Sequence, residues 1–151
     1  MRRPAHGLLQ SGGLMMIAWA LFVAPCLAEP LSPVGYWKTF SDKDNTAESI
    51  VQIREEGGEL RGRLVKLFDS TETVCSACPG DKRDKPLIGL EIMWGAKKSG
   101  DEWKGGKILD PDSGDIYGLV LSLANHGEQL RVRGFIGFSL FGRTQLWLRE
   151  K

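Results

Sequence analysis

Residues 116–138, IYGLVLSLANHGEQLRVRGFIGF, hold two runs of apolar and β-branched residues on either side of one short polar turn. The turn at 125–128 is Asn-His-Gly-Glu, and asparagine and glycine tolerate the positive φ angles that hairpin turns require. Neither flanking run has a helical period longer than two turns. The stretch therefore predicts an antiparallel hairpin with strands at 116–124 and 129–138.

Turns of the same kind occur at 56–59, 98–101 and 112–115, and each joins two strand-like runs. The complete set of predicted strands is Gly35 to Phe40, Glu48 to Glu55, Leu60 to Phe68, Ile88 to Ala96, Glu102 to Asp110, Ile116 to Ala124, Gln129 to Phe138 and Arg143 to Arg149. Eight antiparallel strands in up-and-down order can close into a barrel without exposed edges. The sequence therefore predicts an all-β fold, a small eight-stranded up-and-down antiparallel barrel, with an open sandwich as the alternative.

The first segment, 1–28, has the pattern of a secretory signal peptide. Two arginines near its start precede an apolar run at 14–23, and small residues occupy the positions that a signal peptidase reads. The apolar run is about half the ~20 residues of a membrane-spanning helix. We therefore expect cleavage near Ala28, a periplasmic or secreted single domain at 29–151, and no transmembrane segment in the mature protein. The alternatives are a permanent anchor and lipid attachment at Cys26.

The mature chain carries almost no net charge. The signal segment holds two of the twenty basic residues and none of the nineteen acidic residues, so its removal changes the net charge from +1 to −1. Nucleic acids and anionic membrane surfaces both attract proteins through clustered positive charge. The composition therefore argues against either of them as a partner.

Cys75 and Cys78 form a C-x-x-C motif inside the one long connection, Asp69 to Leu87. This spacing serves redox catalysis, zinc binding or a structural disulfide. No βαβ pattern surrounds the motif, and His126 is the only histidine after residue 28, which is too few ligands for a closed zinc site. In an oxidising compartment a disulfide is favoured, and we expect no metal and no cofactor.

Two other motifs have ordinary explanations. His126 lies in a predicted turn, where a polar side chain is solvated by default, so catalysis through it is not expected. The segment 110–115, DPDSGD, has carboxylates at alternate positions, but position 121, where an EF-hand loop has its bidentate glutamate, is leucine. Turn chemistry accounts for both segments. We therefore expect a protein that is not an enzyme, with an unrecognised activity as the open alternative.

Several short motifs are distributed over nearly all of residues 33–150. They are Gly35-Tyr36-Trp37, Cys75 and Cys78 with Pro79-Gly80, Pro86 to Leu90, Trp103 to Pro111, Tyr117, Leu130 to Gly134 and Gly142 to Arg149. In these motifs the chain resembles an exported bacterial family, the domain of unknown function 2147. The resemblance implies a lipocalin-like, calycin-type barrel with no established reaction. In the lipocalin layout a tryptophan such as Trp37 plugs the closed end, and an arginine such as Arg149 packs over it.

Strand parity separates the last predicted strand into two faces. The odd positions from 143 to 149 share one face, and Leu146 and Leu148 share the other. Simple hydrophobicity directs the leucines inward and makes the arginines a solvated outer face. If the opposite face lines the barrel, buried guanidinium groups need an anion beside them. The candidate ligand-binding residues are then Arg133, Phe135, Gln145, Trp147 and Arg149.

These observations favour a non-catalytic exported barrel that binds an apolar or amphipathic small molecule, including one with an anionic head. The alternative is a periplasmic or secreted envelope interaction protein with a filled barrel and no small-molecule ligand. Cavity volume separates the two, because pockets for small molecules measure ~300 Å³ or more.

Overall fold

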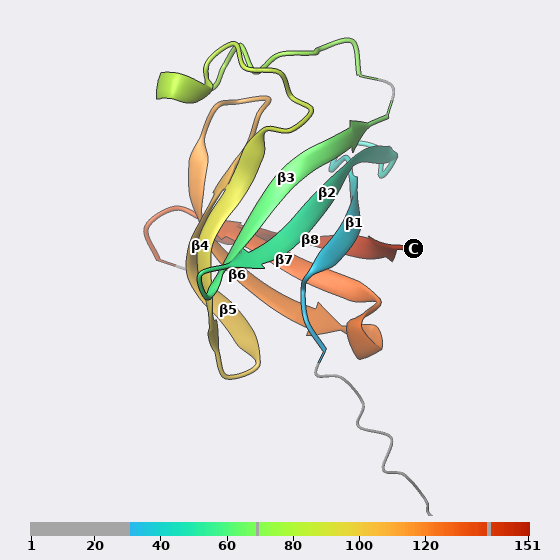
Figure 1. Ribbon diagram of the computed structural model, residues 1–151, viewed down its shortest axis with the longest axis vertical. Helices are drawn as coiled ribbons and strands as arrows, with labels where there is room; N and C mark the ends of the chain where they lie inside the picture. The colour runs from blue at the N-terminus through green and yellow to red at the C-terminus, as the bar shows by residue number, and fades with distance from the viewer. Residues whose placement is uncertain (1–30, 69, 139) are drawn as a thin grey trace, which may run out of the picture.

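A computed structural model of the chain describes residues 31–68, 70–138 and 140–151. The strands are β1 (Gly35–Phe40), β2 (Ala47–Glu56), β3 (Glu59–Leu67), β4 (Glu91–Ser99), β5 (Glu102–Leu109), β6 (Ile116–Ala124), β7 (Gln129–Phe135) and β8 (Gly142–Glu150). Two short 3-10 helices, η1 (Gly80–Lys82) and η2 (Asn125–Gly127), lie in the connections. Each strand pairs antiparallel with the next, and β8 pairs with β1 (Figure 1). The predicted closed eight-stranded barrel is confirmed.

The predicted signal peptide at 1–28 lies outside the described residues. Within them, no helix has both the length and the apolar character needed to cross a bilayer.

The strands lie within one residue of their predicted bounds except β4 and β7, which differ by three. Strand β4 begins at Glu91 rather than Ile88. Gly89 takes a φ of 89°, and the Leu90 amide turns back to donate to the Leu87 carbonyl at 3.1 Å. Positive φ is strained for other residues, so the glycine allows a tight turn that delays the strand.

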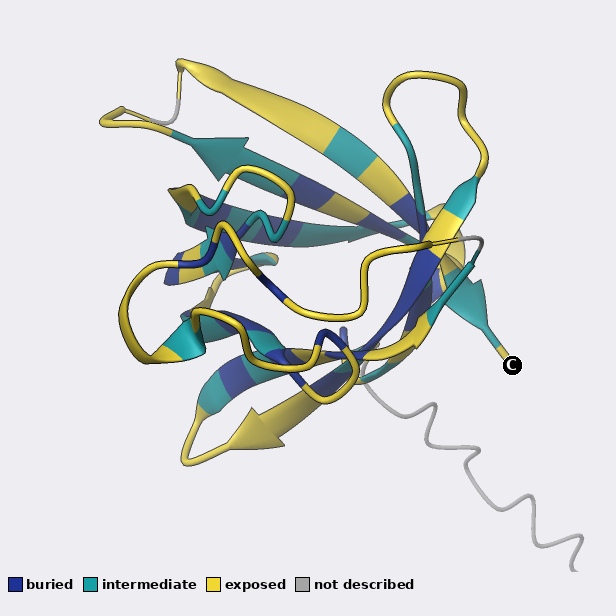
Figure 2. Cartoon of the chain, turned by 90° about the horizontal axis from the view of Figure 1, so that it is seen from above, coloured by how far each residue is buried: buried dark blue, intermediate teal, exposed yellow. Residues whose placement is uncertain are grey.

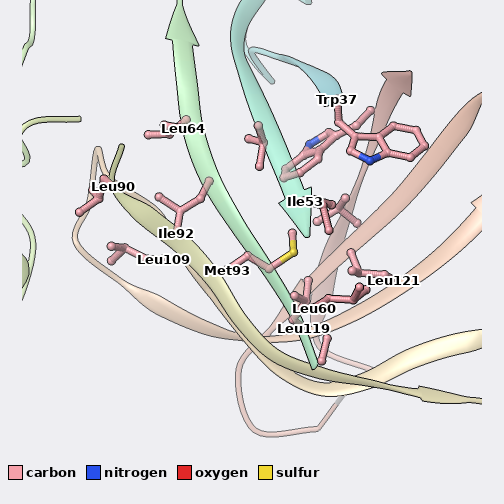
Figure 3. Packing of buried hydrophobic residues seen from close by; sticks show 14 of the residues in the cluster. Trp37, Ile53, Leu60, Leu64, Leu90, Ile92, Met93, Leu109, Leu119 and Leu121 are labelled. Atoms are coloured by element: carbon pink, nitrogen blue, oxygen red, sulfur yellow. The ribbon is translucent and has the colours of Figure 1, made fainter. Parts of the chain in front are cut away.

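All eight strands contribute to one buried apolar cluster, which fills the barrel (Figure 3). Its members include Trp37, Ile53, Leu60, Met93, Trp103, Leu119, Leu121, Leu130, Val132 and Trp147. Strand pairing aligns these side chains, as Trp37 lies opposite Val51 and Leu130 lies opposite Trp147. Protein interiors are packed as densely as organic crystals. Contacts among these buried side chains therefore stabilise the barrel.

The long β3–β4 connection packs onto the barrel over the end drawn uppermost in Figure 1. Four of its apolar side chains, those of Cys75, Cys78, Leu87 and Leu90, are buried in the same cluster. The β5–β6 turn meets this connection so closely that a side chain at Gly114 would overlap the Ala77 carbonyl. The connection is therefore part of the packed fold.

Cys75 and Cys78 form a disulfide with a Cα–Cα distance of 5.3 Å, as the sequence predicts. Both residues are buried, and the Cys75 amide donates to the Lys85 carbonyl at 2.9 Å. A ring this small constrains the unfolded chain only slightly. The disulfide therefore fixes the connection locally.

We expect the double substitution Cys75→Ser with Cys78→Ser to lower the free energy of unfolding by about 2 kcal/mol while the barrel remains folded. Urea unfolding, followed by circular dichroism, measures the loss. The pair Cys75→Ala with Cys78→Ala is the matched control for the burial of serine hydroxyls. Loss of the β-sheet spectrum in both double variants would contradict a local role.

Candidate functional site

The face of β8 that lines the barrel is the one with Trp147. Its indole is buried at 2% exposure, whereas Leu146 and Leu148 are 43% and 40% exposed. The expectation that these leucines point inward is wrong. The cause is the closure of the barrel, because β1 pairs with β8 in a register that sets Trp37 opposite Arg149. This register directs the odd positions of β8 inward.

The five candidate residues do not share one face. Arg133 and Phe135 lie on the outer face of β7, where Arg133 donates to the Thr144 hydroxyl at 3.1 Å and to the Leu140 carbonyl at 3.3 Å. The Phe135 ring lies over Gly118, where an added Cβ would come within 2.6 Å of it. The structure therefore separates these two residues from Gln145, Trp147 and Arg149.

Arg149 closes one end of the barrel. Its guanidinium carbon lies 4.2 Å from the centre of the Trp37 ring. Its nitrogens donate to the carbonyls of Gly127, Ser32 and Val34 at 2.7, 2.8 and 3.0 Å. The acceptors are backbone carbonyls rather than an anionic group. Arg149 thus joins the segment before β1 to η2 and β8.

Gln145 lies at the opposite end of the barrel, within a chain of polar contacts. It accepts a hydrogen bond from the Trp147 indole at 3.1 Å and donates to the Asp42 carboxylate at 2.6 Å. The same carboxylate forms an ion pair with Arg143. Asp42 belongs to the β1–β2 turn, far from β8 in sequence, and no local motif marks it as a partner of Gln145.

This end of the barrel is acidic. Burial raises the pKa of the Glu48 carboxyl, and repulsion from the carboxylates of Asp112, Asp110 and Asp42 raises it further. A neighbouring negative charge disfavours ionisation because the two charges repel. The same repulsion opposes an anionic ligand here.

A small hollow, partly open to solvent, lies at each end of the barrel. One of about 240 Å³ lies beside the polar contacts of Gln145 and is lined by Phe40, Ser41, Asp42, Asn45, Thr144, Gln145 and Leu146. The other, of about 160 Å³, lies near Leu60 and Trp103 at the end closed by Arg149. Both are below the ~300 Å³ of typical small-molecule pockets. Among the described residues, no cluster of three histidine, cysteine or carboxylate side chains could hold a metal ion.

Comparison of the sequence with models of protein families identifies the family of the chain. A family model described as "Uncharacterized protein conserved in bacteria (DUF2147)" matches residues 35–149, from the start of β1 almost to the end of β8. The chain belongs to the DUF2147 family.

Among solved structures, this DUF2147 member is similar to the protein HP1028 from Helicobacter pylori, which is described as belonging to the lipocalin family. The TM-score is 0.72 at 18% identity, and the similarity covers 81% of this chain and 85% of the other. At this identity the likeness concerns the fold alone, and the fold is lipocalin-like. No curated protein matches the chain.

Among the described residues of this DUF2147 member, the most exposed large apolar side chains lie between β7 and β8. Strand β7 ends at Phe135 rather than Phe138, because the Phe141 amide donates to the Phe138 carbonyl and turns the chain. We call residues 136–138 and 140–141 the β7–β8 tip. Its signal in the sequence is an apolar run that continues past Gly137 to Phe141 and is interrupted only by Ser139.

Proposed function

We propose that this DUF2147 member is a non-catalytic, exported envelope protein that acts through its outer surface, with a barrel that holds no small molecule. The observation that carries the proposal is the filled interior, to which every strand contributes. Bulky side chains such as Trp37, Met93 and Trp147 occupy the space in which a roomier barrel of eight strands holds a ligand.

The Cys75–Cys78 disulfide supports export, because such bonds persist in oxidising compartments. The charged groups support a surface role rather than an anion-binding cavity. Arg149 is engaged by carbonyls at the closed end, and the opposite end carries Asp42 and Glu48. An anionic head would therefore approach the carboxylates of Asp42 and Glu48, and the nearby Arg143 guanidinium is already paired with Asp42.

A second candidate is an apolar small molecule bound at the 240 Å³ hollow. Phe40 and Leu146 give this hollow some apolar surface, but its other five lining residues are polar. Its volume would admit only a small part of a drug-sized ligand. The filled barrel remains the better-supported reading.

Native mass spectrometry of the protein, purified after export from its own host, tests the proposal. We expect the mass of the polypeptide with one disulfide and no added ligand. The variant Leu121→Ala is the positive control, because it opens a cavity that an apolar probe such as benzene can enter. A mass that persists in the native state and disappears on denaturation would favour the small-molecule reading instead.

A further inference from the structure

The β7–β8 tip exposes the four most accessible large apolar side chains of the described residues. Ile136, Phe138, Leu140 and Phe141 are 71%, 78%, 84% and 74% exposed, and Leu31 follows at 57%. The tip projects from the barrel in both views (Figures 1 and 2). A group of exposed apolar side chains of this kind marks an interaction site.

Hydrogen bonds hold the backbone of the tip in place. The Phe141 amide donates to the Phe138 carbonyl at 3.0 Å, and the Ile136 amide donates to the Phe141 carbonyl at 3.3 Å. The Arg133 guanidinium donates to the Leu140 carbonyl. These bonds keep the apolar side chains pointing outward, and they satisfy polar groups that would be costly to leave unpaired in hydrocarbon.

The area and the shape of the tip together favour one kind of partner. Four such side chains, each on the order of 150 Å², offer roughly 500 Å² in total at these exposures. A protein interface of standard size buries about 800 Å² on each partner against a complementary surface, so the apolar tip alone would form only part of one. A bilayer accepts a small convex tip without a preformed pocket. From this area, shape and backbone pairing we propose that the tip inserts into a phospholipid bilayer surface.

The charges near the tip indicate apolar insertion rather than electrostatic attraction. Between positions 133 and 143 the only charged residues are the two terminal arginines, and Arg143 is paired with Asp42. The mature chain has a net charge of −1, which gives an anionic surface little to attract. Binding to vesicles should therefore change little with lipid charge or with salt.

Co-sedimentation with phosphatidylcholine vesicles tests this inference, using protein purified after export so that no signal peptide remains. We expect Phe138→Ser with Leu140→Ser to weaken partitioning by about 10-fold or more, because membrane affinity scales with the buried apolar area. The matched control is Ile88→Ser with Leu148→Ser, 54% and 40% exposed, which should bind as the wild type does, since Leu148 pairs with Gln129 at the end of β8 far from the tip. Phe138→Trp should also retain binding.

Three outcomes would overturn the inference. The first is a folded wild-type protein that does not bind these vesicles, and the second is equal loss in the tip and control variants. The third is self-association in solution that the tip substitutions abolish, with no vesicle binding, which would make the tip an interface between proteins. The inference rests on the proposed surface role, but the two can fail separately. If native mass spectrometry shows no bound ligand and the protein does not bind vesicles, membrane insertion is wrong and the filled-barrel proposal stands. If native mass spectrometry shows a retained ligand and vesicle binding depends on the tip, the filled-barrel proposal is wrong and membrane insertion stands.

Discussion

Replacing Trp37 with alanine is expected to lower the free energy of unfolding by about 3–5 kcal/mol. The side chain is fully buried, and its indole N–H donates to the Pro33 carbonyl at 2.7 Å. The substitution leaves a large cavity against Val51 and also removes the ring beneath Arg149. Urea unfolding followed by far-ultraviolet circular dichroism measures the loss without depending on tryptophan fluorescence.

Trp37→Phe separates the two contributions of the indole. It retains much of the apolar volume but leaves the Pro33 carbonyl without its donor, so we expect a smaller loss of about 1–3 kcal/mol. If Trp37→Ala unfolded at the same urea concentration as the wild type, the tryptophan would not stabilise the closed end of the barrel.

Arg149→Ala is expected to cost about 2–4 kcal/mol, because it removes charge-assisted hydrogen bonds to three carbonyls and a cation–π contact. The segment before β1 loses its link to β8, so we also expect faster cleavage by protease near Ser32. Thermal unfolding and the rate of limited proteolysis measure the two effects.

The matched control is Arg131→Ala, an exposed arginine on the outer face of β7, for which we expect a change below ~0.5 kcal/mol. Arg149→Lys keeps the charge, but an ammonium group lacks the planar fork that reaches three acceptors. The free energy of unfolding of this variant should therefore lie between those of the wild type and Arg149→Ala. Equal effects at Arg149 and Arg131 would contradict the role of Arg149 at the closed end.

The strands could be predicted because their signals are local. A period of two residues and turns such as 125–128 and 112–115 can be read from adjacent positions. The start of β4 could not, since it depends on Gly89, whose amide donates to the Leu64 carbonyl on another strand. A boundary set by contact between distant segments leaves no local signal.

The candidate site was harder to predict for the same reason. Which face of β8 points inward depends on the register of β1 against β8, and this register joins opposite ends of the barrel sequence. Asp42 reaches Gln145 across the same long separation. The disulfide followed from a short motif, whereas the inward position of Trp147 and the outward positions of Arg133 and Phe135 required the pairing of β8 with both of its neighbours.

Closure between β1 and β8 has a consequence for the order of folding. During vectorial synthesis β1 emerges before the other strands of the barrel, but one of its two neighbours, β8, is the last of these eight strands to be made. Neighbouring hairpins can form as they emerge, whereas the closing contact must wait and then overcome the entropy of a long loop. Until that step the chain is an open sheet with two unpaired edges, which can pair with other chains and aggregate. Pairing of the nine-residue strand β8 with β1 removes both edges.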